Sequence, residues 1–157
     1  MKKLFLISNL LIMILVPSVT FGNVIDKLNE VGKFTKLNET LVKSGLNKNL
    51  KGNGPFTVFA PLDDAFAAIS AKTYYGLLSD DNKDKLIKIL GRHVFSKKIT
   101  SSEINGEINV KAINGEEIKI KKVNGIVYIN EAEVVTADVE VSNGVIHFIN
   151  RVLQPLN

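Results

Sequence analysis

Residues 143–155 read NGVIHFINRVLQP, a turn-forming pair followed by an almost continuous apolar run. An Asn-Gly pair accommodates the positive φ angles of tight hairpin turns, so a strand is expected to begin after Gly144. Between Val145 and Ile149 only His147 is polar, which is typical of a strand that is buried on both faces. In such a strand, His147 shares its face with Val145 and Ile149. The stretch therefore predicts a turn and then a strand inside the protein.

The residues before this stretch repeat the same turn signal. Asn-Gly pairs begin at Asn105, Asn114, Asn124 and Asn143, and runs of β-favouring residues separate them. This spacing predicts a meander of short antiparallel strands from Gly106 onward.

Helical spacing dominates the region before Gly106. Apolar residues recur three or four positions apart within residues 24–41, and a second helix is expected from Ser79-Asp80 through Leu90. Between them, residues 55–59 form a short predicted strand, and Asp63 is the expected N-cap of a helix that follows it. The pattern predicts an α+β domain with a helical N-terminal half and a strand-rich C-terminal half.

Residues 1–22 have the pattern of a secretory signal peptide. Lys2 and Lys3 precede an apolar run, and small residues surround a predicted cleavage site after Gly22. The run is shorter than the roughly 20 residues that a transmembrane anchor needs, so cleavage is favoured over anchoring. We expect export to the periplasm, the cell surface or the extracellular space, with one folded domain in residues 23–157.

The composition is that of an ordinary globular domain, with 45% hydrophobic and 23% charged residues. There is no cysteine, which excludes a disulfide framework, a thiol nucleophile and a thiolate metal site. Removing residues 1–22 takes away two lysines and no acids, which lowers the formal net charge from +4 to +2. Basic and aromatic residues are not interleaved in this sequence, so it gives no indication of nucleic-acid binding.

Three segments, in this order, resemble the signatures of the fasciclin domain family. Residues 54–66, GPFTVFAPLDDAF, are similar to the family's first signature. Residues 86–94, LIKILGRHV, are similar to the central helix that leads into a Tyr-His pair, and residues 143–155 are similar to the C-terminal signature. Together the three segments extend the resemblance over about residues 23–157.

The chain departs from the family pattern at three positions. Leu62 stands where Ser or Thr is usual, which leaves helix capping to Asp63. Arg92 replaces the Tyr of the Tyr-His pair, and Asn150 replaces an Asp. In animal members the region around Tyr-His is implicated in receptor binding, and only His93 and its apolar neighbours carry over here.

The resemblance implies a fasciclin-like β-wedge, with short strands in two sheets packed against several helices. It implies a non-enzymatic adhesion or recognition module without a cofactor, which binds a cell-surface protein, a matrix protein or a polysaccharide. Proximity to a membrane surface and weak self-association are left open. The alternative is a periplasmic or secreted carrier that holds a small apolar or lipid ligand between its sheet and its helices.

Two sets of residues are assigned roles. Adjacent tyrosines bury large area at low entropic cost, and Arg92 lies in the region that the resemblance points to. The lysines form the densest basic cluster, which a solvated strand face explains better than an anionic partner does. The candidate partner-binding residues are Tyr74, Tyr75, Arg92, His93, Val94, Lys119, Lys121 and Lys122. The residues assigned to fold maintenance are Thr57, Phe59, Ala60, Pro61, Asp63, Phe66, His93, Asn143, Gly144, His147, Leu153 and Pro155.

Catalytic chemistry and metal binding are not expected. His93 and His147 lie in apolar runs, where a neutral histidine bonded to the backbone is a better explanation than a general base or a metal ligand. Asp63 and Asp64 diverge by about 100° on a helix, which argues against a shared acid and base cleft. Nucleophile and phosphate-loop motifs are missing from the sequence. A hydrolase is therefore only the third hypothesis.

Overall fold

The strand predicted within residues 143–155 lies at the centre of the sheet. The computed structural model describes residues 21–154. Strand β7 (Gly144–Ile149) pairs in parallel with β1 (Phe56–Pro61) and antiparallel with β6 (Ala132–Val141). Both edges of β7 are therefore hydrogen-bonded, and five of its six residues are buried. A continuous apolar run fits a strand in this position. The parallel partner was not anticipated, because the turn signals predict only antiparallel neighbours.

The predicted α+β organisation is confirmed, with helices in the first half and most strands in the second. The helices are α1 (Val24–Val31), α2 (Thr35–Ser44), α3 (Leu46–Asn49), α4 (Ala71–Leu77) and α5 (Lys83–Gly91), and three short 3₁₀ helices are η1 (Asp63–Ala68), η2 (Asp80–Asn82) and η3 (Ser101–Glu103). The remaining strands are β2 (Val94–Phe95), β3 (Glu107–Lys111), β4 (Glu117–Val123) and β5 (Ile126–Ile129).

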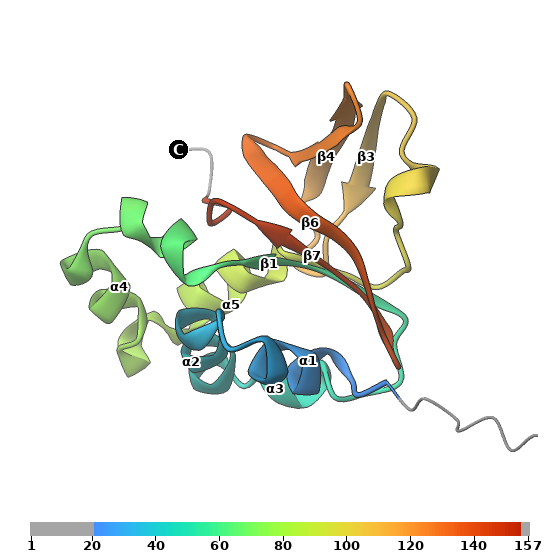
Figure 1. Cartoon of the computed structure of the whole chain (residues 1–157). Helices are drawn as coiled ribbons and strands as arrows, with labels where there is room; N and C mark the ends of the chain where they lie inside the picture. The colour runs from blue at the N-terminus through green and yellow to red at the C-terminus, as the bar shows by residue number, and fades with distance from the viewer. Residues whose placement is uncertain (1–20, 155–157) are drawn as a thin grey trace, which may run out of the picture.

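All seven strands form one hydrogen-bonded order, β2-β1-β7-β6-β5-β4-β3. The two predicted sheets are two arms of this order, because β6 pairs with β7 in one arm and with β5 in the other. The register between β6 and β7 shifts twice, between Val134 and Thr136 and between Thr136 and Val139. Such bulges bend a strand, and β6 carries the sheet around from one arm to the other. Figure 1 shows β3, β4 and β6 above the β1–β7 pair, with the helices below it.

Three of the four Asn-Gly pairs connect consecutive strands of the predicted meander. The clearest is Asn124-Gly125 between β4 and β5, where both residues have positive φ angles, 51° and 79°. The pairs that begin at Asn114 and Asn143 lie between β3 and β4 and between β6 and β7. The fourth pair, Asn105-Gly106, joins the 3₁₀ helix η3 to β3, the first strand of the meander.

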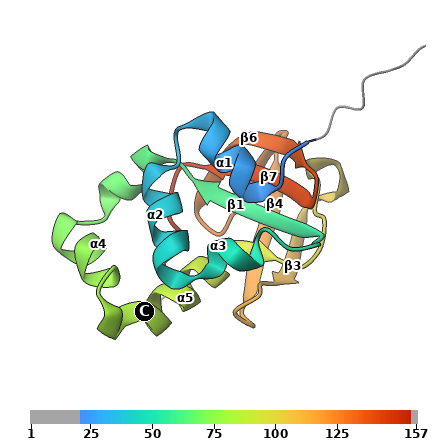
Figure 2. The same cartoon turned by 90° about the horizontal axis from the view of Figure 1, so that it is seen from below.

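The core has two parts, divided by the β1–β7 pair. Side chains alternate along a strand. In β1, Val58 faces a cluster formed with the helices, whereas Phe59 faces a cluster enclosed by β3–β6. In β7, Ile146 belongs to the helical cluster and Ile149 to the strand cluster. Seen from below, helices α1 and α3 lie on either side of β1 (Figure 2). Both helices contribute residues to the helical cluster.

Asp63 caps a different helix from the one predicted. The segment after β1 is the 3₁₀ helix η1, with Leu62 at its N-cap position and no capping bond from a side chain. The Asp63 carboxylate instead accepts a hydrogen bond of 2.9 Å from the backbone N–H of Lys36, in the first turn of α2. The backbone N–H of Asp63 also donates to the backbone carbonyl of Lys33, at 3.0 Å. The residue therefore satisfies a free N–H group at a helix N-terminus, as a cap does, but across the tertiary fold.

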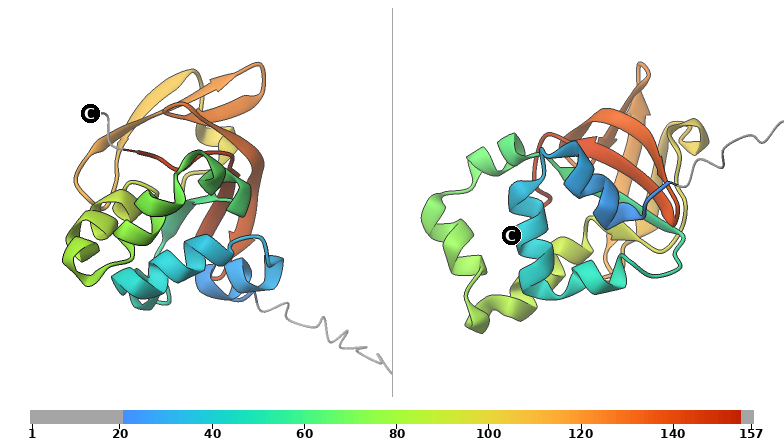
Figure 3. Two further views of the ribbon diagram at one scale, coloured as in Figure 1. Left: turned by 90° about the vertical axis from the view of Figure 1, so that its left-hand side faces the viewer. Right: turned by 60° about the horizontal axis from the view of Figure 1, so that its bottom comes forward.

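Helix α4 extends away from the sheet. Figure 3 shows η1 and α4 curving out and around the side of α2 and α5. Its N-terminus is capped by Ser70, whose hydroxyl accepts a hydrogen bond of 3.1 Å from the N–H of Thr73. Both tyrosines predicted as contact residues lie on this helix, so its orientation decides which of them reaches the surface.

Candidate functional site

His147 is held by the backbone through both ring nitrogens. Its Nε2 donates to the carbonyl of Ile99 at 2.7 Å, and its Nδ1 accepts from the N–H of Asp138 at 3.1 Å. The ring stacks on Phe59, with a centroid distance of 5.0 Å. Burial lowers the pKa of His147, because it penalises the charged imidazolium. With both nitrogens in use, the neutral ring joins three segments of backbone.

His93, just after the end of α5, is held by the backbone in the same way as His147. Its Nδ1 donates to the carbonyl of Ile89 at 2.9 Å, and its Nε2 accepts from the N–H of Leu153 at 2.9 Å. Burial lowers the pKa of His93 to about 4. His93 is 2% exposed, and the neighbouring Val94 is equally buried.

Arg92, His93 and Val94, which the sequence offers as partner-binding residues, are all buried in this structure. Arg92 is 8% exposed. Its guanidinium donates to the carbonyl of Gln154 and forms an ion pair of 2.5 Å with Glu116. Arg92, which stands where the family carries Tyr, thus links the end of α5 to the end of the described chain and to the β3–β4 turn.

The residues assigned to fold maintenance lie where segments distant in sequence meet. Asn143 accepts a hydrogen bond of 3.0 Å from the N–H of Val24, and its amide donates to the carbonyls of Leu50 and Gly52. The hydroxyl of Thr57 accepts from the N–H of Ile99 at 2.8 Å.

The other members of this set are mainly apolar core residues. Phe59, Ala60, Phe66 and Leu153 are each at most 5% exposed. Pro61 is buried at the end of β1. Pro155 lies outside the described residues, as do residues 1–20 of the predicted signal peptide.

The two tyrosines have opposite environments. Tyr74 is 7% exposed, and its hydroxyl donates to the carboxylate of Glu39 at 2.5 Å. Burial and this carboxylate raise the pKa of Tyr74 well above that of an ordinary phenol. Tyr75 is 68% exposed, and its ring meets that of Tyr74 edge-on at 5.4 Å. Of the two tyrosines predicted as contact residues, only Tyr75 lies at the surface, whereas Tyr74 packs inward.

The lysine cluster on β4 does not form a single basic face. Lys119 forms an ion pair of 3.0 Å with Glu107 on β3, which lies diagonally across the strand pair, since the register partner of Glu107 is Lys121. Lys121 lies 5.7 Å from the ring of Tyr128, and Lys122 donates to the carbonyl of Ser101 at 3.1 Å. Since consecutive residues of a strand point to opposite faces, Lys121 and Lys122 cannot meet one anion together.

A groove between α2 and α4 was not predicted from the sequence. It encloses about 530 Å³ and is lined by Asn38, Glu39, Val42, Lys43 and Leu78. Val42 is 65% exposed. Tyr75 does not line the groove itself; its ring contacts Tyr74, which bonds Glu39 in the groove wall. The available signal was Val42 itself, an apolar residue outside the stripe of Leu37 and Leu41 that faces the core.

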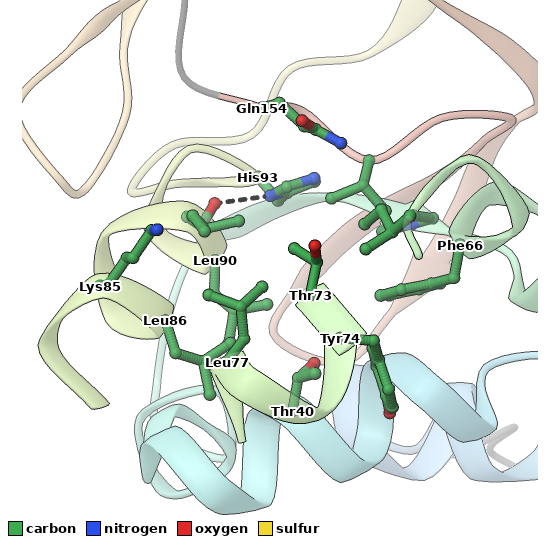
Figure 4. A pocket seen from close by; sticks show the side chains of 14 residues that line it. Thr40, Phe66, Thr73, Tyr74, Leu77, Lys85, Leu86, Leu90, His93 and Gln154 are labelled. Carbon is green, nitrogen blue, oxygen red and sulfur yellow. Dashed lines mark hydrogen bonds between the residues drawn. The ribbon is translucent and has the colours of Figure 1, made fainter. Parts of the chain in front are cut away.

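A second hollow lies on the inner side of α4 (Figure 4). It encloses about 160 Å³, and its lining comes from α2, η1, α4, α5, the segment after β7 and Pro61 at the end of β1. It shares no lining residue with the groove. The sequence predicted a ligand space between the sheet and the helices, whereas this pocket lies mainly among the helices and touches the sheet only at Pro61. It is also smaller than the roughly 300 Å³ at which typical ligand pockets begin.

The described part of the chain contains neither a metal-binding cluster nor a membrane span. Within residues 21–154, no group of three or more His, Cys, Asp or Glu side chains is arranged to hold a metal ion. Over the same residues, no helix is long and apolar enough to cross a bilayer.

Comparisons with known proteins agree with the resemblance seen in the sequence. The profile of the fasciclin domain matches residues 32–155. "Protein sll1483" of Synechocystis sp. is 46% identical over 123 residues, covering 78% of this chain and 67% of that protein. The transforming growth factor-beta-induced protein ig-h3 of Sus scrofa is 34% identical over 134 residues, covering 85% of this chain. This chain spans 19% of the length of the Sus scrofa protein.

A solved structure has the same fold. It is a FAS1 domain pair from the insect cell adhesion molecule fasciclin I, which superposes with a TM-score of 0.75. The match covers 87% of this chain and 52% of the pair, at 23% sequence identity.

Proposed function

The chain belongs to the fasciclin domain family, and from this premise we propose that it is an exported, non-enzymatic module for adhesion or recognition. Its partner is a protein of a cell surface or of an extracellular matrix. The solved structure with the same fold belongs to a cell adhesion molecule, which supports this class of function without identifying a partner.

The observation that carries the proposal is the exposed apolar face at the α2–α4 groove. Tyr75 and Val42 are 68% and 65% exposed, the two largest values among the large hydrophobic residues of the described chain. Leu78, one turn after Tyr75, lines the same groove. Exposed apolar residues beside a hollow favour binding, and tyrosine is enriched among residues that dominate interface energies.

The groove also carries charges at its border. Lys43 in its wall pairs with Asp80 at 2.7 Å, and Glu39 accepts the bond from Tyr74. An apolar centre with a polar rim is the usual anatomy of a protein–protein interface. This composition favours a protein over an anionic polysaccharide. On β4, the charge of Lys119 is already paired with Glu107, which reduces its attraction for a polyanion.

The histidines support a non-enzymatic role. A general base or a metal ligand needs a ring nitrogen that is free to meet a proton donor or a metal. Both nitrogens of His93 and of His147 instead bond backbone groups. We infer that neither residue takes part in proton transfer or metal binding.

Export and cleavage after Gly22 are part of the proposal. Helix α1 begins next to the proposed cleavage point, where Asn23 is its N-cap and forms a capping box with Asp26. A new N-terminus at Asn23 would leave this capping arrangement in the chain. The intact mass of the protein recovered from the cell envelope or the medium tests this proposal. A recovered chain that retains residues 1–22 would contradict cleavage.

The binding proposal is tested with the purified mature protein, titrated onto producer cells and onto immobilised surface and matrix proteins. We expect saturable binding that persists at physiological salt, and Tyr75→Ala combined with Val42→Ser should weaken it at least about tenfold, since central contact residues contribute more than about 1 kcal/mol each.

Val123→Ser is the matched control, because Val123 is an exposed apolar residue at the β4–β5 turn, distant from the groove. Equal loss of binding in the control, or undiminished binding in the double variant, would contradict the proposed face. Binding that disappears with added salt would indicate diffuse attraction by lysines in its place.

A further inference from the structure

The pocket on the inner side of α4 has an apolar interior. Phe66, Leu77, Leu86 and Leu90 form much of its wall, and Figure 4 shows their side chains pointing into the same space. Its volume of about 160 Å³ is close to that of an engineered apolar cavity of roughly 150 Å³ that stays dry and binds benzene. The pocket therefore has room for one ring or a short branched chain.

The polar groups of the inner wall are already bonded within the protein. Thr40 donates to the carbonyl of Leu37 at 2.7 Å, and Tyr74 donates to Glu39. His93 uses both ring nitrogens on backbone groups. Among the described residues, no buried side-chain nitrogen or oxygen lacks a hydrogen-bond partner. Thr73 also lines the pocket, and its hydroxyl accepts a bond of 2.9 Å from Ser70. The buried polar groups thus offer a ligand no unpaired donor or acceptor, which favours an apolar inner part.

The rim differs from the interior. Lys85 on α5 lines the pocket, is exposed, and forms no ion pair within residues 21–154. Gln154 lines it from the segment after β7, and Figure 4 shows its side chain near that of His93. The pocket therefore combines a closed apolar end with an available cation at its opening, an arrangement that is complementary to an apolar acid.

We propose that this pocket binds a small amphipathic monocarboxylate, with a ring or short branched chain inside and its carboxylate beside Lys85. The volume excludes a drug-sized molecule, which needs roughly 300 Å³ or more. The site shares no lining residue with the α2–α4 groove, so a substitution in the lining of one leaves the lining of the other unchanged.

Two probes with the same ring test the proposal on the purified full-length protein. Benzoate supplies the ring and the carboxylate, and benzyl alcohol supplies the ring without charge. Methyl NMR spectra are recorded during titration with each probe. We expect saturable shifts at Ile69, Leu77 and Leu90, which line the pocket, with dissociation constants on the order of millimolar for ligands this small.

Two variants separate the interior from the rim. Leu77→Phe fills the pocket and should abolish binding of both probes. Lys85→Gln should weaken benzoate about two- to fivefold, as expected for an exposed ion pair, and leave benzyl alcohol unchanged. Lys88→Gln is the matched control, because Lys88 is an exposed lysine on the same helix that does not line the pocket.

The shifts in the unmodified protein decide the question even if Leu77→Phe does not fold. Absence of saturation with both probes, or shifts centred outside the pocket, would overturn the site. A folded Leu77→Phe protein that binds as before would also overturn it. An unchanged preference for benzoate in Lys85→Gln would overturn the assignment of the carboxylate to Lys85.

Discussion

Two buried histidines connect distant parts of this chain. His93 links the end of α5 to Leu153, and His147 links β7 to the segment at Ile99 and to the bulge at Asp138. In each ring one nitrogen donates and the other accepts, which only the neutral form can do. Protonation would place a second N–H against a backbone N–H that already points at the ring.

This arrangement predicts that the protein loses stability at mildly acidic pH. The pKa of His93 is 6.5 in the unfolded chain and about 4 in the folded one. Between these two pH values the unfolded state binds more protons than the folded state does. The contribution of His93 to the free energy of unfolding is therefore fully present above pH 6.5 and is lost as the pH falls towards 4. His93 alone should account for about 2 kcal/mol between pH 7 and pH 5. The lowered pKa of His147 acts in the same direction.

Urea denaturation at several pH values between 7 and 5 measures the effect. His93→Gln should reduce stability at pH 7 and also reduce its dependence on pH over this range. If the variant kept the full pH dependence of the unmodified protein, the histidine would not be its source.

Among the elements, the parallel β1–β7 pair tolerates the least change. Gly144 begins β7, and a Cβ atom at this position would overlap the backbone carbonyl of Phe56 in β1. The two strands can be this close only because residue 144 has no side chain. Gly76 is different, because it lies inside α4 and a Cβ there would contact nothing within 4 Å.

Two substitutions of the same type should therefore have opposite effects. Gly144→Ala should destabilise the protein by more than about 3 kcal/mol, because backbone would have to move. Gly76→Ala should stabilise it by about 0.5–1 kcal/mol, because alanine loses less backbone entropy in a helix. Thermal unfolding of the two variants measures both changes. Equal effects of the two substitutions would contradict the close approach of β1 and β7.

At the scale of the molecule, both parts of the core share the same two strands. Val58 and Ile146 belong to the helical cluster, and Phe59 and Ile149 belong to the strand cluster. If either the helices or strands β3–β6 detached, one apolar face of β1 and β7 would be exposed. The domain should therefore unfold as a single unit, as small domains usually do.

This predicts one denaturation midpoint for helices and strands. Circular dichroism follows the helices, and the amide NMR signals of β4 follow the strands. Ile120→Val in β4, a buried change worth about 1 kcal/mol, should lower both midpoints equally. The exposed change Val123→Ala serves as the control. Loss of the β4 signals at a lower denaturant concentration than the helical signal would show two separate units.

Much of the architecture was predictable because it depends on local chemistry. The Asn-Gly turns, the apolar run of β7 and the spacing of Leu37 and Leu41 each reflect φ angles or a repeat along a few residues. The parallel partner of β7 had no such signal, because it comes from a segment some ninety residues earlier, at Phe56–Pro61. The candidate site was less predictable, because adjacent tyrosines look alike in sequence.

The sequence by itself determined the α+β class, the turn positions, the lack of disulfide chemistry and the resemblance to the fasciclin domain. Each of these depends on residue identity and spacing within short segments, which local backbone preferences convert into structure. Tertiary packing decided that Arg92 and Tyr74 lie inside, that Tyr75 and Val42 lie outside, and that Asp63 caps α2. It also created the pocket under α4. These features depend on how far-separated segments approach one another, and the direction of a side chain relative to such neighbours is not encoded in its local pattern.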